Sequence, residues 1–160
     1  MYKKILVPLD GSELAECVLP HVESIANGCG VQDVVFLRVA EPLHWVVEPP
    51  YDVEDSISFR ERDVRLIDSE NKVTAEKYLN QLVTRTQYEG VTIQSEVVMG
   101  RAAESIAEYA TKNGVDLIII ATHGRSGVSR WVWGSVADRV LHSACVPVLM
   151  IRAPGCVAGI

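Results

Sequence analysis

Five short segments rich in apolar and β-forming residues alternate along this chain with segments of helical periodicity. The apolar segments are "KKILVPLD" at residues 3–10 and the stretches 33–41, 90–100, 115–121 and 146–152. Strands that alternate with helices favour a parallel sheet, because each crossover helix returns the chain to the same end of the sheet. Parallel sheets of this kind are covered by helices on both faces. We therefore predict a single-domain, Rossmann-like, doubly wound α/β/α sandwich of three layers with a five-stranded parallel sheet.

The segments between the strands carry helical signals of unequal quality. The first begins near Ser12, a candidate N-cap, and runs to about residue 30, but Pro20 inside it should kink the helix. The second, residues 59–87, has a partial apolar stripe made of Val64, Ile67, Leu79, Leu82 and Val83. Residues 101–114 and 135–144 are predicted helices, and the proline-rich, acidic stretch 42–58 is a predicted loop.

Composition excludes several classes of protein. The net charge of −6 argues against a nucleic-acid partner, because phosphate backbones attract clustered Lys and Arg. Apolar runs are far shorter than the roughly 20 residues of a membrane span, so we expect no membrane partner. The apolar run near the N-terminus is short and ends at Asp10, so this segment is not a signal peptide. We therefore expect a cytoplasmic protein with reduced cysteines. One domain is expected over residues 1–152, followed by a flexible tail at 153–160.

Two strand ends carry glycine, serine and polar side chains, namely "PLDGS" after the first strand and "ATHGRSG" after the fourth. Doubly wound sheets bind ligands beyond the carboxyl ends of their strands, where the strand order reverses. In the second loop, Gly124 and Gly127 allow a close approach of the backbone to a ligand. Gly134 and Ser135 precede a helix whose free N–H groups favour an anion. These residues form either a site for a phosphorylated ligand or an ordinary strand-to-helix connection with a serine cap.

Asp10 stands at the end of the first strand, opposite that loop if the first and fourth strands are neighbours. Its carboxylate could accept hydrogen bonds from ribose hydroxyls or from an adenine amine. It would repel phosphates, so it should face the nucleoside end of a nucleotide. The alternative role of Asp10 is to cap the helix that begins near Ser12.

The whole chain resembles the universal stress protein family. The resemblance runs through "KKILVPLDGSELAECVLPHVESIA", "VVFLRVAEP", "VVMGRAAESIAEYA", "VDLIIIATHGRSGVSRWVWGSVADRVL" and "CVPVLMIR". ATP-binding members of the family carry a pattern G-x-x-G-x9-G-[ST] after the fourth strand. Gly124, nine intervening residues, Gly134 and Ser135 match this pattern, whereas Ala121 stands in place of its first glycine.

This resemblance implies a strand order of 3-2-1-4-5 and an adenine-nucleotide site that holds ATP, or ADP or AMP, with or without Mg²⁺. The residues it implies are Asp10 with the backbone of Pro8 and Leu9 at the adenosine, Val39 at the adenine, Gly100, Ile120 and Ala121 near adenine and ribose, His123, Gly124 and Arg125 beside the phosphates, and Gly134, Ser135, Val136 and Ala137 around them. It also implies a homodimer joined through the last strand, residues 146–152.

Three functions remain open from the sequence. They are a nucleotide-binding regulatory protein of the stress response, an enzyme that uses or slowly hydrolyses ATP, and a scaffold dimer that needs no nucleotide. We expect the first, because the chain has no Walker lysine and no acidic cluster for Mg²⁺ beyond Asp10. Trp131 and Trp133 lie in the nine-residue spacer, where they either pack the loop or anchor an unknown protein partner.

Overall fold

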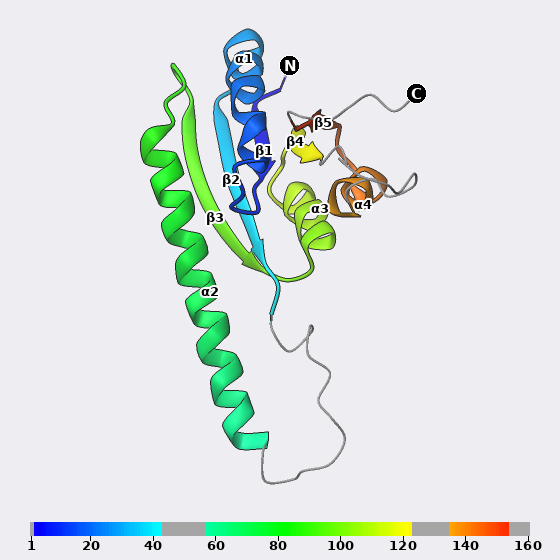
Figure 1. Ribbon diagram of the computed structural model, residues 1–160. Coiled ribbons are helices and arrows are strands. Elements are labelled where there is room, and N and C mark those ends of the chain that lie inside the picture. Colours follow the sequence, from blue (N-terminus) through cyan, green and yellow to red (C-terminus); the bar gives the residue numbers. More distant parts are fainter. Residues whose placement is uncertain (1, 43–56, 123–134, 154–160) are drawn as a thin grey trace.

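The computed structural model describes residues 2–42, 57–122 and 135–153, with backbone only at 57–62 and 135 (Figure 1). Its elements are β1 (Lys4–Pro8), the 3₁₀ turn η1 (Ala15–Val18), α1 (Leu19–Cys29), β2 (Asp33–Ala40), α2 (Ile57–Arg85), β3 (Thr92–Met99), α3 (Ala102–Lys112), β4 (Leu117–Thr122), α4 (Ser135–Ser143) and β5 (Val148–Arg152). All paired strands are parallel, and their order is β3-β2-β1-β4-β5. The predicted fold class and strand order are therefore confirmed.

Alternate residues of the central strands build two separate cores, one on each face of the sheet. Val7 and Phe36 pack with side chains of α1 and α2 on one face, whereas Leu6 and Leu37 pack with side chains of α3 and α4 on the other. Ile118 and Ile119 of β4 are likewise fully buried, as the apolar run predicts. The three layers follow from this division of the strand residues, and Figure 1 shows the helices on the two sides of the sheet.

The first helix starts later than the sequence predicts. Residues Ala15–Val18 form the 3₁₀ turn η1, and α1 begins at Leu19 with Pro20 in its first turn. A proline is tolerated there, because the N–H that it lacks has no partner inside the helix. The expected kink is therefore wrong, since the proline marks the start of the α-helix. The helix ends at Gly30, whose φ of 66° is the left-handed conformation of a glycine cap.

Among the side chains of α2 that the structure describes, those buried against the sheet lie in the C-terminal half of the helix. Ala75, Leu79 and Leu82 are buried, but Leu66 is 64% exposed and Ile67 is 39% exposed. The N-terminal turns of this helix extend past the ends of β2 and β3 (Figure 1). Ile67 is therefore not part of the buried stripe, in contrast to the expectation from its spacing. Among the described helices, none is both long and apolar enough to cross a bilayer.

Candidate functional site

A cavity of about 290 Å³ opens at the carboxyl ends of the central strands. Its walls come from the ends of β1, β2 and β4, from η1, and from the first turns of α3 and α4. The lining residues are Pro8, Leu9, Asp10, Ala15, Leu37, Val39, Ala102, Ile106, Ile120, Ala121, Val136 and Ala137. This is the place where the strand order reverses, which is the usual ligand site of a doubly wound sheet.

The pairing of β1 explains why the cavity opens on its β4 side. The register with β2 runs to Pro8↔Leu37, and the Leu9 N–H continues it by donating to the Leu37 carbonyl at 2.8 Å. The register with β4 covers Ile5↔Leu117 and Leu6↔Ile118. Beyond these pairs the cavity lies between Pro8 and Leu9 of one chain segment and Ile120 and Ala121 of the other.

Two helices begin at the cavity. Ala102 and Ile106 of α3 and Val136 and Ala137 of α4 belong to its wall. The first N–H groups of a helix have no partner within it and carry the positive end of the helix dipole. In α3, the Ala102 N–H donates to the Glu41 carboxylate at 3.3 Å. A carboxylate of the chain itself thus already stands at the start of α3.

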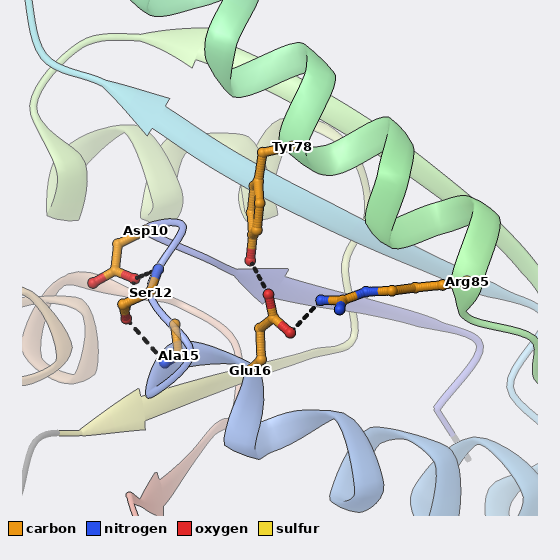
Figure 2. A network of polar contacts seen from close by, with 6 residues as sticks. All are labelled: Asp10, Ser12, Ala15, Glu16, Tyr78 and Arg85. Carbon is orange, nitrogen blue, oxygen red and sulfur yellow. Dashed lines mark hydrogen bonds and ion pairs between the residues drawn. The ribbon is translucent and has the colours of Figure 1, made fainter.

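Asp10 lies at the mouth of the cavity and organises the turn that follows it (Figure 2). Its Oδ1 accepts a hydrogen bond from the Ser12 N–H at 2.9 Å and another from the Ser12 hydroxyl at 2.6 Å. The Ser12 Oγ in turn accepts from the Ala15 N–H at 3.1 Å. The Ser12 side chain therefore bonds the first N–H of η1, the 3₁₀ turn, rather than an N–H of α1. The Asp10 carboxylate therefore shapes the turn before η1 and also belongs to the cavity wall.

Gly11 is the one residue of this turn that has to be glycine. Its φ is 85°, a conformation that other residues rarely adopt. A Cβ at Gly11 would also collide with the guanidinium of Arg38. The glycine lets the turn lie directly against the Arg38 side chain from β2.

The structure brings together eight of the fourteen residues that the resemblance implies. Those that line the cavity are Pro8, Leu9, Asp10, Val39, Ile120, Ala121, Val136 and Ala137. Gly100 is buried at the end of β3, where its N–H donates to the Ala40 carbonyl, and it is not part of the wall. Residues His123, Gly124, Arg125 and Gly134 lie outside the described residues, as do the tryptophans of the spacer and most of the 42–58 loop. Ser135 is described only as the first residue of α4.

Four lining residues were not predicted from the sequence. Leu37 lies two residues before Val39 on the same strand, so strand periodicity could have found it. Ile106 follows Ala102 by four residues on one face of α3, which helical periodicity could have found. Ala15 had no such signal, because the 3₁₀ turn that carries it was predicted as helix. Within the described ranges, no group of three or more His, Cys, Asp or Glu side chains is placed to hold a metal ion.

Residues 1–152 match the model of the Universal stress protein family. The chain belongs to this family. It is 31% identical over 154 residues to universal stress protein MJ0531 of Methanocaldococcus jannaschii, an alignment that covers 96% of this chain and 84% of the relative. It also resembles the solved structure of MJ0577, a universal stress protein of the same organism, with a TM-score of 0.76 and 27% identity over 97% of this chain and 99% of that one.

Two more distant structures of the family contain a nucleotide. One is a universal stress protein family protein of Arabidopsis thaliana with AMP bound, which has a TM-score of 0.57, is 16% identical, and is matched over 96% of this chain and 93% of that one. The other is a universal stress protein in complex with cAMP, with a TM-score of 0.58 and 16% identity over 95% and 98% of the two chains. At this identity the likeness establishes the shared fold.

Proposed function

We propose that this universal stress protein binds an adenine nucleotide in the cavity and acts as a homodimeric regulatory module. The observation that carries the proposal is the position of the cavity, between the ends of β1 and β4 and against the first turn of α4. Solved relatives with AMP and cAMP make adenine the expected base. ATP, ADP and AMP are the candidate ligands, with Mg²⁺ accompanying the phosphates.

The walls of the cavity suggest how the nucleotide lies. A volume of about 290 Å³ is at the lower end of the range for small-molecule pockets, so it suits a nucleoside better than a whole triphosphate. Leu37, Val39 and Ile120 provide an apolar surface for the base. Asp10 is exposed at the mouth, where its carboxylate would accept hydrogen bonds from the ribose hydroxyls. The phosphates would then extend toward the first turn of α4, whose N–H groups favour an anion.

The proposed dimer rests on strand β5. In the register of the described strands, β5 pairs with β4 and forms one edge of the sheet. The Pro147 carbonyl and the Ala153 N–H both bond toward β4. Because this direction alternates along a strand, the backbone groups of Val148 and Met150 face outward. An apolar edge of this kind is suited to pair with the same strand of a second copy.

Calorimetric titration with ATP, ADP and AMP, each with Mg²⁺ present, tests the binding proposal. We expect one nucleotide per chain and micromolar or tighter affinity for at least one of the three. Mass spectrometry of the denatured protein then identifies any nucleotide carried through purification. Absence of heat with all three nucleotides would contradict the proposal, and multiple turnover of ATP at a useful rate would replace the binding role with an enzymatic one.

A further inference from the structure

A glutamate beside the cavity wall joins the turn η1 to the long helix α2 (Figure 2). Glu16 has a side chain that is only 20% exposed, and it follows Ala15 of the cavity wall. One of its oxygens accepts a hydrogen bond from the Tyr78 hydroxyl at 3.0 Å, and the other forms an ion pair with Arg85. Both partners belong to the C-terminal half of α2, more than sixty positions away in the sequence.

The same turn carries polar contacts that lead to the cavity mouth. The Ala15 N–H donates to the Ser12 hydroxyl oxygen, and the Ser12 hydroxyl donates to Asp10. Glu16 is therefore connected to Asp10 through residues 11–15, a turn that the Ser12 and Ala15 hydrogen bonds hold together. A shift of Glu16 would displace Ala15 in the cavity wall and would reach Asp10 through Ser12.

Tyr78 is also held from the side of the sheet. The guanidinium carbon of Arg38 lies 5.6 Å from the centre of the Tyr78 ring. Arg38 stands between two lining residues of β2, Leu37 and Val39, and its guanidinium lies against Gly11. Burial, and after it the hydrogen bond to Glu16, raise the pKa of the Tyr78 hydroxyl, so the phenol keeps its proton and remains a donor. Helix α2 thus contacts Glu16 and Arg38, which adjoin lining residues of the cavity in η1 and β2.

We propose that Glu16 is a positioning residue of the nucleotide site, which couples the affinity of the cavity to helix α2. This inference rests on the proposed function, since the ligand is the adenine nucleotide. Coupling between two sites is reciprocal, so a bound nucleotide should also steady the C-terminal half of α2. Helix α2 is then the element that reports the bound state.

Removal of a single hydroxyl tests the coupling with a matched control. Tyr78→Phe removes the donor to Glu16, whereas Tyr88→Phe removes a similar donor, which bonds the Leu19 carbonyl at the start of α1. Leu19 is not part of the cavity wall. We expect Tyr78→Phe and Glu16→Gln to weaken the binding of adenosine and ATP about fivefold or more, by the same factor for both ligands. Tyr88→Phe should leave both affinities within about twofold of the wild type.

An exchange of charges provides a rescue. The double variant Glu16→Arg with Arg85→Glu keeps an ion pair between η1 and α2, and it should recover part of the affinity that Glu16→Arg alone loses. The titrations are made well below the unfolding midpoint of each variant, because a restored ion pair would also stabilise the fold and only fully folded protein reports the affinity itself.

Amide hydrogen exchange measures the connection directly, first without ligand and then with ATP. Faster exchange of the Ala15 amide is expected in Glu16→Gln and Tyr78→Phe but not in Tyr88→Phe, and added ATP should slow exchange in residues 75–85 of the wild type. Nucleotide binding that is unchanged in Glu16→Gln and Tyr78→Phe would overturn the inference and leave the proposed function intact. A wild type that binds no adenine nucleotide would overturn both, and equal Ala15 exchange in all variants would refute the connection itself.

Discussion

Replacement of Asp10 by asparagine probes the predicted contact with the ribose. The carboxylate stands exposed at the mouth of the cavity, next to the apolar walls that would hold the base. An asparagine keeps one oxygen that can accept from Ser12, so the turn is preserved while the charge is removed. Hydrogen bonds to a charged group contribute about 1.5–3 kcal/mol, which corresponds to about 10–150-fold in affinity. Because Asp10 is exposed to water, we expect the lower end of this range, about tenfold.

The assay is a calorimetric titration of wild type and Asp10→Asn with ATP and with 2′,3′-dideoxy-ATP. If the carboxylate bonds the ribose hydroxyls, the variant loses affinity for ATP, but the two proteins bind the dideoxy nucleotide about equally. Ser12→Ala is the control for the turn, since it removes the hydroxyl bonds to Asp10 and Ala15 and keeps the carboxylate. Asp63→Asn, on the exposed face of α2, is the control for loss of charge. An unchanged affinity for ATP, or an equal loss with both nucleotides, would refute the assignment to the ribose.

Three further changes test other parts of the account. Val39→Trp fills the apolar end of the cavity and should weaken ATP binding about tenfold or more in the same titration, whereas unchanged affinity would place the base elsewhere. Asp116→Ala removes the acceptor of the Lys3 and Lys4 N–H groups and should lower the midpoint of thermal unfolding at pH 7 by about 2–4 °C. Those hydrogen bonds hold the pKa of Asp116 below its ordinary 3.8, so its contribution is present above that value and is lost as the pH falls through the lowered pKa. The difference between wild type and variant should therefore shrink in acid, and a difference that is constant with pH would contradict this assignment. Met150→Pro removes an outward-facing N–H of β5 and should yield monomers by light scattering, whereas an intact dimer would place the interface elsewhere.

The sequence predicts the fold well, because each strand and helix carries its own signal. The apolar run at 115–121 indicates a central strand that is buried on both faces. Alternate residues of such a strand pack against the helices on opposite sides of the sheet. The start of α1 was misplaced, because Ser12 and Pro20 are both plausible start signals and only packing decides between them. Ile67 has suitable spacing for the core, but the sequence does not tell where the sheet ends beneath a long helix.

The sequence predicts only part of the candidate site, because some of its residues depend on local turns and on long-range packing. Leu9 and Ala121 stand at the ends of the first and fourth strands, and the family resemblance makes these strands neighbours, so that their carboxyl ends meet at the same edge. Ala15 reaches the cavity only because the chain forms a 3₁₀ turn before α1, a local choice that the hydrophobic pattern does not specify. The pairing of Glu16 with Arg85 spans 69 positions and depends on how α2 packs, which no local pattern reveals.

A crystal structure of the protein grown with ATP and Mg²⁺ tests the central claim most directly. The account predicts one nucleotide per chain, with adenine between Val39 and Ile120, the ribose hydroxyls at the Asp10 carboxylate, and the phosphates leading to the first turn of α4. A nucleotide bound at another surface, or an empty cavity at saturating ATP, would contradict it.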